Sequence, residues 1–477
     1  MRFLISAGEA SGDTYGAQLI EALRGLAPSP QDTQDRRAPG TPMPGSTFFG
    51  MGGEKMRASG AELLVHAHEV AVVGLVEVLT HLPGIRRRFK HLVAEAARRK
   101  PDAAILIDFP DFNLRLAREL HHLGIPVFYF VSPQIWAWRT GRVQQIRKYV
   151  RKMIVIFPFE QEFYARHGVE VSYVGHPLAY EPQPEISREE FAAKHFLDPK
   201  KQWIALLPGS RRKEVRLNLP AMLQAAQLLQ KERNGFEFVL PVASTLNAEW
   251  LKEQMQQMPG LKPEFIKGAD AALKGRSSTE GSSSFTRQPV TKQCNSSDLV
   301  ATEQPTTTAG WSRHSGLRKD SIEIPASAAE VKNSTERDRR MPIHLTDNAR
   351  ATLMHARAAV VASGTATVEA ALSGTPFIVV YRLAPLTWLL GRRLVKLDTF
   401  AMPNLIAGKR IVPELIQKDF TAQNVFKELN KIIPEGPARQ QMEADLKMVQ
   451  QRLHDSPDAE SPAQRAAREI LGALRPA

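Results

Sequence analysis

The stretch VASGTATVE at residues 361–369 indicates the fold of this chain most directly. It continues the apolar run Ala358–Ala362, which is typical of a buried strand, and then takes up a helical pattern. Ser363, Gly364 and Thr365 are therefore expected on a turn that joins a strand to a helix. Such a turn presents free backbone N–H groups and the positive end of a helix dipole, and both favour an anion.

Glu369 lies about one helical turn beyond that turn. A carboxylate at this place is able to accept hydrogen bonds from two ribose hydroxyls, and a phosphate together with a ribose is a nucleotide. The alternative is an ordinary Ser/Thr helix cap followed by an unrelated surface glutamate. The turn alone leaves both interpretations open.

A second turn of the same kind favours the nucleotide. The sequence LLPGSRRKEV at residues 206–215 completes the apolar strand Trp203–Leu207 and enters a helix. Gly209 lets the backbone approach a ligand closely, and Ser210 adjoins it. Arg211 carries a planar fork of donors that suits phosphate oxygens.

A third turn, GEASGD at residues 8–13, follows the first strand, Phe3–Ala7. It lacks the G-x-G-x-x-G spacing of dinucleotide-binding turns, which disfavours a Rossmann oxidoreductase. It places Glu9 directly after a strand, where open α/β sheets bind their ligands.

Strands and helical patterns alternate along the chain, as in βαβ units that build parallel sheets. The proline-rich segment Pro177–Pro184 divides the pattern in two and is read as a hinge, and Thr421–Leu474 is a helical tail. We therefore expect two α/β domains with a cleft between them. The strands expected are Phe3–Ala7, Ala103–Ile107, Val127–Val131, Met153–Ile156 and Val169–Val174, then Trp203–Leu207, Phe236–Pro241, Ala358–Ala362 and Phe377–Val380.

Two segments do not fit this pattern. Residues 28–45 are rich in proline, glutamine and charge and are expected to form an extended loop. Residues 268–340 are rich in Ser, Thr, Lys and Arg with few large apolar side chains, so they cannot bury enough surface to offset their ordering entropy. We expect this second segment to be a largely disordered insertion, with a regulatory or docking segment as the alternative.

The composition is that of an ordinary globular protein with an anionic partner. The 477 residues are 43% hydrophobic and 24% charged, and the net charge is +13. The charge does not distinguish nucleic acid, a membrane surface and a phosphorylated substrate. The single cysteine, Cys294, argues against a disulfide framework and a cysteine-based zinc site. The sequence shows neither a signal peptide nor an apolar run of about 18 residues.

The sequence ILIDFPDFN at residues 105–113 ends a buried strand with two acids. Asp108 stands at the carboxyl end of the strand and is therefore expected at the cleft. Asp111 and Asn113 are candidates for capping the helix that follows. Both acids have a purely structural reading, which we accept for Asp111. For Asp108 we favour a functional role, because capping poorly explains an acid directly at the strand end.

Two further places carry candidate site residues. QIWAWR at residues 134–139 sets Trp136 beside Arg139, a pair able to stack on a sugar or base, although a packing role for at least one tryptophan is an alternative. His176 follows a glycine at the domain junction, where a contact with phosphate and a structural role are equally plausible.

Taken together, these motifs resemble those of the lipid-A-disaccharide synthase family, which are glycosyltransferases of lipid A assembly. Eight short motifs occur in the family's order and span most of the chain apart from the two insertions. They are GEASGD (8–13), AVVGLVEVL (71–79), IDFPDFN (107–113), VSPQIWAWR (131–139), GHP (175–177), LLPGSR (206–211), SGTATVE (363–369) and PNLIAG (403–408).

The resemblance implies an α/β architecture of two Rossmann-like parallel-sheet domains with an interdomain cleft, the GT-B arrangement. Residues 1–178 would bind the acceptor, and residues 185–420 would bind the nucleotide of the donor. Residues 421–477 would be helices that pack back toward the first domain.

The resemblance also implies an inverting transfer of 2,3-diacylglucosamine from its UDP derivative to the 6-hydroxyl of 2,3-diacylglucosamine 1-phosphate. Asp108 is the candidate base, and Glu9 either orients the acceptor or is itself the base. Donor-binding candidates are Gly209, Ser210, Arg211, Ser363, Gly364, Thr365 and Glu369, with Asn404 and Glu414 from the PNLIAG segment and an expected helix after it. Ser11, Trp136, Arg139 and His176 are candidates for the acceptor side of the cleft.

No Asp-x-Asp motif stands beside a strand end, so we expect neither a required metal nor a cofactor. We see no nucleic-acid module either. A second enzyme of this fold, such as a UDP-N-acetylglucosamine epimerase, is the first alternative. A non-catalytic nucleotide-binding protein that docks on membranes is the second. A homodimer is left open.

Two apolar stretches flanked by cations suit an anionic membrane surface. The first is Val72–Leu82, including Leu75, followed by Arg86, Arg87, Arg88 and Lys90. The second contains Trp388 and is followed by Arg392, Arg393 and Lys396. Each stretch alone is better read as a buried helix with a charged end, but two of them and an implied lipid acceptor favour the membrane. We therefore expect a cytoplasmic protein bound peripherally to the inner face of the inner membrane.

Overall fold

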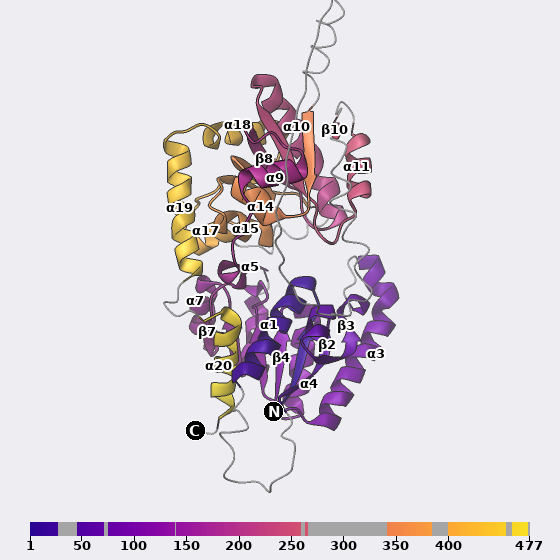
Figure 1. The fold of residues 1–477 in the computed structure, drawn as a ribbon. Helices are drawn as coiled ribbons and strands as arrows, with labels where there is room; N and C mark the ends of the chain where they lie inside the picture. The colour runs from indigo at the N-terminus through magenta and orange to yellow at the C-terminus, as the bar shows by residue number, and fades with distance from the viewer. Residues whose placement is uncertain are drawn as a thin grey trace, which may run out of the picture.

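The computed structural model contains two parallel β-sheets, one in each of two domains that lie one above the other (Figure 1). It describes residues 1–26, 45–70, 75–138, 140–258, 263–265, 341–383, 399–454 and 460–475. Among the described residues, no helix has the length and apolar content needed to cross a bilayer.

The first sheet has seven strands in the order β3-β2-β1-β4-β5-β6-β7. Its strands alternate with helices along the chain, as the sequence predicts. The strands are β1 (Arg2–Ala7), β2 (Thr47–Gly52), β3 (Ala61–His66), β4 (Ala103–Ile107), β5 (Val127–Phe130), β6 (Lys152–Val155) and β7 (Val171–Tyr173). The helices are α1 (Ala10–Leu26), α2 (Glu54–Ala58), α3 (Leu75–Arg99), α4 (Pro110–His122), α5 (Ile135–Trp138), α6 (Val143–Tyr149) and α7 (Pro158–Arg166).

The second sheet also has seven strands, in the order β10-β11-β9-β8-β12-β13-β14. Its strands are β8 (Gln202–Leu207), β9 (Phe236–Pro241), β10 (Pro263–Phe265), β11 (Met341–Thr346), β12 (Ala358–Ala362), β13 (Phe377–Tyr381) and β14 (Glu414–Ile416). The remaining helices are α8 (Pro177–Tyr180), α9 (Arg188–His195), α10 (Arg212–Glu232), α11 (Ala248–Gln256), α14 (Ala349–His355), α15 (Thr365–Leu372), α17 (Met402–Ala407), α18 (Ala422–Ile432), α19 (Pro437–Leu453) and α20 (Pro462–Leu474).

Both faces of the first sheet are covered, which explains why β4 and β5 consist of apolar and aromatic residues throughout. Phe3 and Ile5 of β1 belong to an apolar cluster with α1 and α20 on one face. Leu4 of β1 belongs to a second cluster, with α3, α4 and α6, on the other face. Successive residues of a strand point to opposite faces, so an uninterrupted apolar run is what two covered faces require.

Each sheet has one point where the order of strands reverses. In the first sheet this point lies between β1 and β4, which pair with Ala7 beside Ile107. In the second it lies between β8 and β12, which pair with Val361 beside Leu207. Loops diverge from the carboxyl ends of strands at such a point and leave a crevice for a ligand. The three predicted turns and Asp108 all follow strands that border these two points.

All nine strands predicted from the sequence are present, three with the predicted bounds (β4, β9 and β12) and six with shifted ends; Val169–Val174, for example, is reduced to β7. Five strands were not predicted: β2, β3, β10, β11 and β14. β2 reads TFFGMG, and β3 reads AELLVH and is only partly buried, so neither has the run of large apolar residues that marks the central strands.

The chain crosses between the domains twice, and the two crossings lie together. The first crossing includes α8, in the predicted hinge, and the second joins α19 to α20 (Figure 1). The ring of Tyr180 on α8 contacts His454, with 5.0 Å between ring centroids, and the guanidinium of Arg465, at 4.9 Å. Gly175 has a φ of +85°, and a Cβ there would lie 2.6 Å from Nη2 of Arg465, so glycine permits this approach.

Of the C-terminal helices, only α20 lies on the first domain. Ala463, Ala466 and Ile470 of α20 join the apolar cluster of α1. Leu429 of α18 and Leu446 of α19 belong instead to the core of the second domain. The apolar packing of the tail on the first domain is therefore made by α20, and α19 adds a hydrogen bond from Oη of Tyr173 to the carbonyl of Arg452 at 2.9 Å.

Candidate active site

Asp108 directly follows β4 and has an unusual backbone conformation. Its φ is +46°, and that of Phe109 is +51°, so two consecutive non-glycine residues adopt the left-handed region. Each such residue costs on the order of 1 kcal/mol or more, and strain of this kind gathers at functional sites. The expectation that Asp108 lies at the carboxyl edge of the sheet agrees with this position.

The GEASGD turn lies against the Asp108 turn, and its first glycine makes the contact. A Cβ on Gly8 would lie 2.3 Å from the ring of Phe109, so no larger residue fits there. Close contact between the two turns brings Glu9 beside Asp108. This packing role of Gly8 is not visible in the sequence, because it depends on a neighbour about 100 residues away in the chain.

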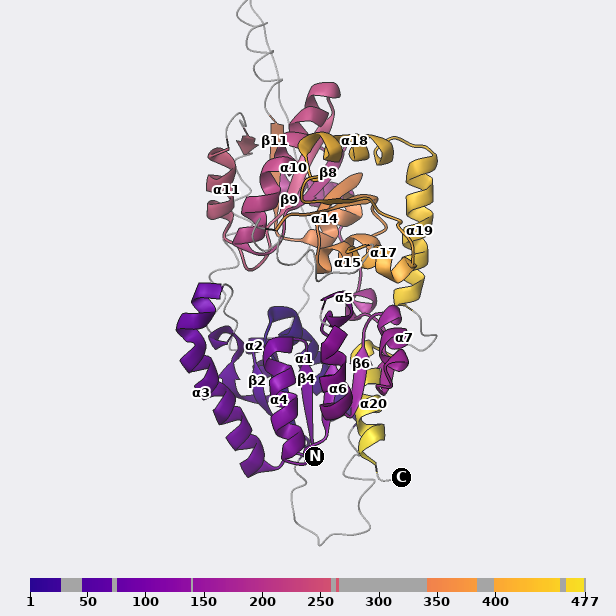
Figure 2. The same ribbon diagram turned by 180° about the vertical axis from the view of Figure 1, so that it is seen from behind.

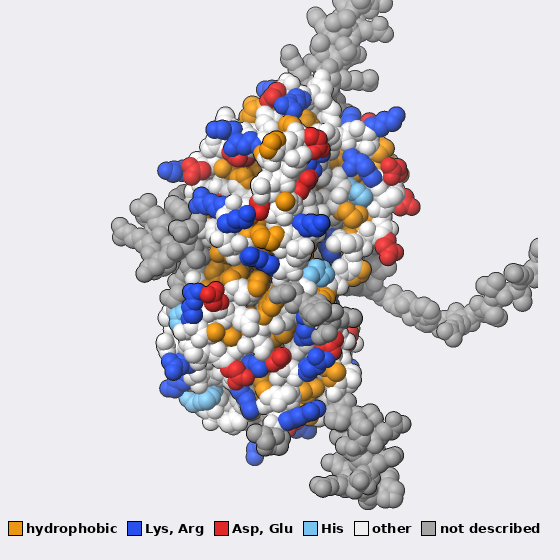
Figure 3. Space-filling model, turned by 90° about the vertical axis from the view of Figure 1, so that its left-hand side faces the viewer, with side chains coloured by type: hydrophobic (Ala, Val, Ile, Leu, Met, Phe, Trp, Pro, Cys, Tyr) orange, Lys and Arg blue, Asp and Glu red, His pale blue; other side chains and the backbone are white. Residues whose placement is uncertain are grey.

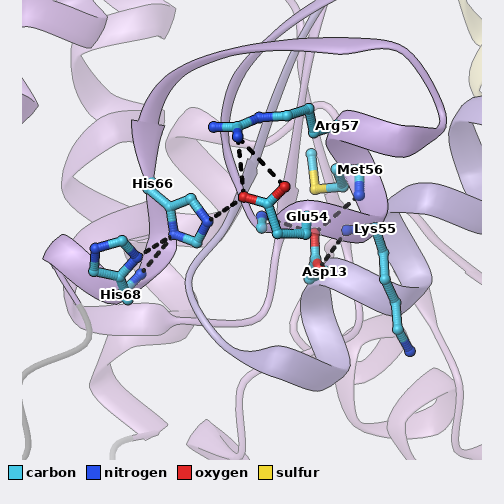
Figure 4. A network of polar contacts seen from close by, with 8 residues as sticks. Asp13, Glu54, Lys55, Met56, Arg57, His66 and His68 are labelled. Carbon is cyan, nitrogen blue, oxygen red and sulfur yellow. Dashed lines mark hydrogen bonds and ion pairs between the residues drawn. The ribbon is translucent and has the colours of Figure 1, made fainter. Parts of the chain in front are cut away.

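The last residue of the same motif, Asp13, stabilises the start of α2 (Figure 4). Its carboxylate accepts hydrogen bonds from the backbone N–H groups of Gly53 (2.7 Å), Lys55 (3.1 Å) and Met56 (3.1 Å). Beside it, Glu54 pairs with Arg57 and with His66 (Figure 4). Asp13 therefore has a structural role.

The two domains meet at an ion pair. Nη2 of Arg211, in the turn after β8, lies 3.6 Å from Oε1 of Glu9, in the turn after β1. A second carboxylate, that of Glu214, lies 3.6 Å from Nη1 of Arg211. Arg211 remains half exposed, so a ligand phosphate can reach it. The structure thus brings Glu9, Asp108 and Arg211 together across the cleft.

The surroundings of Asp108 raise the pKa of its carboxyl group to about 7. Burial is the main cause, and the negative charge of Glu9 adds to it. A hydrogen bond from the backbone N–H of Phe109 and the positive charge of Arg211 act in the opposite direction. A carboxylate with a pKa near neutrality suits general-base catalysis.

The turn between β12 and α15 has the predicted form. Gly364 is the N-cap of α15, its φ is +147°, and no atom lies within 4 Å of the place where a Cβ would stand. Gly364 and Thr365 are exposed, and Ser363 is half-buried. The N–H of Thr367 is already bonded to the carbonyl of Gly364 (3.0 Å), so the N–H groups that an anion could use are those at the exposed start of α15 before it.

The turn between β8 and α10 is arranged differently. Glu214 accepts hydrogen bonds from the N–H groups of Ser210 (3.1 Å) and Arg211 (3.3 Å). Gly209 has a φ of +123°, and a Cβ there would lie 2.6 Å from Oε2 of Glu214. In this turn Gly209 therefore makes room for Glu214, and the group left for a ligand is the side chain of Arg211.

Glu369, on α15, faces groups from both domains. Burial raises the pKa of its carboxyl group, the charge of Glu181 raises it further, and Arg350 lowers it. Oε2 of Glu181 pairs with Nη1 of Arg350 at 2.8 Å. Tyr15 of α1 is buried, and burial followed by the charges of Glu181, Glu369 and Asp108 raises the pKa of its hydroxyl. Neither Tyr15 nor Arg350 was selected from the sequence.

Asn404 and Glu414 form a network of their own. Asn404 is fully buried in α17, and Glu414 lies in strand β14 instead of the expected helix. Nδ2 of Asn404 donates to Oε1 of Glu414 at 2.7 Å, and its Oδ1 accepts from the N–H of Ile411 (2.7 Å). Glu414 also accepts from the N–H of Phe400 (2.9 Å). These bonds fix the conformation of residues 400–414, and they do not depend on contacts with a donor.

Trp136 and His176 both pack at the domain junction. The indole N–H of Trp136 donates to Oε1 of buried Glu160 at 3.2 Å, and burial raises the pKa of that carboxyl group to about 8. His176 is buried and caps α8 by accepting from the N–H of Leu178 (3.2 Å). Burial lowers the pKa of His176 to about 3, so it is neutral at pH 7 and offers a phosphate no charge. Arg139 lies outside the described residues.

The capping roles predicted for Asp111 and Asn113 are wrong. The N-cap of α4 is Phe109, and no side chain caps it. Asp111 forms an exposed ion pair with Arg142. Asn113 is fully buried beneath β1 and bonds to backbone and side-chain atoms there. In the part of the chain that the structure describes, no three His, Cys, Asp or Glu side chains gather in a way that suits a metal ion.

Comparison with solved structures supports the architecture. The chain superimposes on the Staphylococcus aureus MnaA–UDP co-structure with a TM-score of 0.52 at 11% identity, covering 99% of this chain and 95% of that one. A glycosyltransferase of kitacinnamycin gives a TM-score of 0.53 at 11% identity, covering 100% and 99%. At this level of identity the similarity shows the fold alone, and it confirms the predicted pair of Rossmann-like domains.

Comparison of sequences identifies the family. The family model described as lipid-A-disaccharide synthetase matches residues 3–273 and 321–469. The lipid-A-disaccharide synthase of Koribacter versatilis is 44% identical over 471 residues, which cover 99% of this chain and 98% of the relative. That of Myxococcus xanthus is 36% identical over 476 residues, which cover 100% and 98%. The chain belongs to the lipid-A-disaccharide synthase family.

Proposed function

We propose that the protein transfers 2,3-diacylglucosamine from its UDP derivative to the 6-hydroxyl of 2,3-diacylglucosamine 1-phosphate. The products are the β-1,6-linked disaccharide 1-phosphate and UDP. The substrates follow from family membership. The observation that carries the reaction type is the meeting of Asp108, whose pKa is about 7, with Arg211 from the opposite domain.

The chemistry assigns one task to each group. Asp108 takes the proton of the acceptor hydroxyl while its oxygen attacks C1 of the donor sugar and the bond from C1 to UDP breaks. Arg211 and the N-terminus of α15 stabilise the negative charge that develops on UDP. Glu369 accepts hydrogen bonds from the ribose. Attack from the side opposite the leaving group inverts the configuration at C1.

The direct test is to incubate the purified protein with both lipid substrates and to follow the products by mass spectrometry. Disaccharide 1-phosphate together with UDP supports the proposal. Turnover of UDP-N-acetylglucosamine to its epimer instead supports the alternative that the protein is an epimerase. A solved UDP-GlcNAc 2-epimerase has a similar fold, so this outcome has to be tested. Binding of UDP with no turnover of either substrate indicates the non-catalytic alternative.

The rate should depend on pH through Asp108. The base must be ionised, so kcat rises as the pH increases through about 7 and levels off above it. Removing the charge of Glu9 stabilises the carboxylate of Asp108 and lowers its pKa. Glu9→Gln should therefore move the acid limb of the kcat profile to lower pH and leave the plateau within a few fold of wild type. An unchanged limb, or a variant with no turnover at any pH, contradicts this assignment.

We infer that the protein also binds anionic membrane surfaces peripherally, through α3. The helix lies along the outer edge of the first domain (Figure 2). On it Leu82 is 46% exposed, and Arg86 and Arg87 are exposed. Arg88 instead pairs with Glu69 at 2.9 Å. On the side of the molecule opposite α3, cationic and anionic side chains are interspersed over both domains (Figure 3). Val72, Trp388, Arg392 and Arg393 lie outside the described residues.

Arg86→Ser combined with Arg87→Ser should weaken binding to vesicles of anionic lipid about 30-fold at low salt, because each cation near the surface contributes about 1 kcal/mol. Binding of the wild type should fall as salt is added. Lys427→Ser with Lys447→Ser removes the same charge from exposed positions of the second domain and serves as the control. Vesicle sedimentation measures both. Equal binding by the two double variants would refute a role for α3.

A further inference from the structure

Two buried side chains hold the backbone carbonyl of Asp108. Oη of Tyr129, on β5, donates a hydrogen bond to this oxygen at 2.6 Å. Nδ2 of Asn113, on α4, donates a second at 2.8 Å. Tyr129 and Asn113 are both fully buried. One carbonyl oxygen thus accepts two bonds from side chains that cannot reach water.

The amide of Asn113 is itself fixed in orientation. Its Oδ1 accepts a hydrogen bond from the hydroxyl of Ser6 at 2.7 Å, and Ser6 is fully buried in β1. Its Nδ2 also lies 3.1 Å from the carbonyl oxygen of Ile107. Asn113 therefore links β1, β4 and the turn of Asp108. The carbonyl oxygens of Ile107 and Asp108 can only accept hydrogen bonds, so the NH₂ group of Asn113 has to face them, and its oxygen is left to accept from the hydroxyl of Ser6.

These hydrogen bonds hold a strained segment of backbone. The left-handed φ angles of Asp108 and Phe109 are unfavourable for residues with a Cβ, so the turn stays as it is only if its surroundings hold it. The positions of the carbonyl and of the carboxylate of one residue both depend on its φ and ψ. Fixing the carbonyl against Tyr129 and Asn113 therefore also fixes the direction of the Cα–Cβ bond, which carries the carboxylate.

We propose that Tyr129 and Asn113 are positioning residues, which hold the Asp108 carboxylate toward the cleft by binding the carbonyl of the same residue. The inference rests on the proposed function, because it assigns Asp108 the role of base. It explains why the segment IDFPDFN ends in a buried asparagine, for which helix capping gives no account. Both side chains are fully buried, so a substrate in the cleft does not reach them.

The positioning also affects the charged form of the base. The same conformation lets the backbone N–H of Phe109 bind the Asp108 carboxylate, and this bond lowers the pKa of that carboxyl group. Among the described residues, the charged groups that act on Asp108 are Glu9 and Arg211, from the turns after β1 and β8, and the titratable hydroxyls of Tyr15 and Tyr129 also interact with it. If the turn relaxes while those charges stay, the bond from Phe109 weakens and the pKa rises.

The test is Tyr129→Phe, which removes one hydroxyl and keeps the packing of the ring. We expect kcat to fall about tenfold, as for one lost hydrogen bond, with UDP affinity unchanged. We also expect the acid limb of the kcat profile to move to higher pH. Asn113→Ser should act in the same direction. In the Asp108→Asn background, Tyr129→Phe should cost nothing further in kcat, because the positioned group has lost its function.

Tyr164→Phe is the matched control. Tyr164 is also fully buried in the first domain, and its hydroxyl bonds to Oγ of Ser132 at 2.8 Å instead of to Asp108. It should lose a similar amount of stability and keep the kcat and the pH profile of the wild type. Equal effects of Tyr129→Phe and Tyr164→Phe on kcat and on the profile would overturn the proposal.

The failure of the proposed function would look different. In that case the wild type itself forms no disaccharide. The positioning is then read from an NMR titration of the Asp108 carboxyl group, assigned by its absence in Asp108→Asn. A higher pKa in Tyr129→Phe than in the wild type supports the positioning role, and an equal pKa refutes it.

Discussion

Asp108→Asn is expected to lower kcat by roughly 10²–10⁴, the usual contribution of a general base. Asparagine keeps the shape of the side chain and loses its basicity, and a primary hydroxyl is a weak nucleophile at neutral pH. The UDP affinity should stay near that of the wild type, because the proposed donor-binding groups lie in the second domain. Single-turnover rates give the first value, and calorimetry with UDP gives the second.

Two further variants decide between the candidate bases. If Glu9 is the base, Glu9→Gln abolishes turnover and Asp108→Asn retains most of it. The geometry favours the reverse, since Asp108 lies in the half-buried turn after β4 with its pKa raised to about 7, whereas Glu9 is half exposed and pairs with Arg211 at 3.6 Å. Asp111→Asn, in the first turn of the helix α4 that follows, is the control. Its exposed ion pair with Arg142 contributes at most about 1 kcal/mol, so kcat should not change.

The two-domain α/β fold was predictable because its signals are local. Buried strands such as Ala103–Ile107 are short apolar runs, and each is followed by a turn and a helical pattern. Of the strands that escaped prediction, β2 contains glycines and β10 and β14 have only three residues, whereas in β3 and β11 polar residues interrupt the apolar ones. Their place in the sheet comes from pairing with neighbours distant in the chain, which a local pattern does not record.

The candidate site was predictable only in part, for the same reason. Asp108 follows from its place at the end of a strand, and the α15 turn from its glycine. Local reasoning gave Asp111 and Asn113 capping roles, because both residue types favour helix starts. The left-handed conformation of Phe109 instead provides the N-cap and frees Asn113 to enter the core. The contacts of Gly8 with Phe109 and of Gly209 with Glu214 arise only once the chain has folded.

Arg211→Ala should impair both the binding of UDP and its departure in the reaction. We expect weaker binding of UDP and a fall in kcat of about 10²-fold, since a group that stabilises developing charge acts mainly in the transition state. Glu369→Ala should act mainly on the KM for the donor, because ribose contacts are the same in the ground state and the transition state. Arg212→Ala is the matched control, since Arg212 is also exposed and stacks on Trp250, 5.2 Å from its ring centroid.

Measuring kcat above pH 7 separates the effect of Arg211 on the base from its effect on the leaving group. Its positive charge lowers the pKa of Asp108, so its removal raises that pKa and moves the acid limb of the kcat profile to higher pH. At about pH 9 the base is ionised in both proteins, so the loss of kcat that persists there belongs to the leaving group. Wild-type UDP affinity in Arg211→Ala and in Glu369→Ala would show that the donor site lies elsewhere. A rate fully restored at high pH would show that Arg211 serves the base alone.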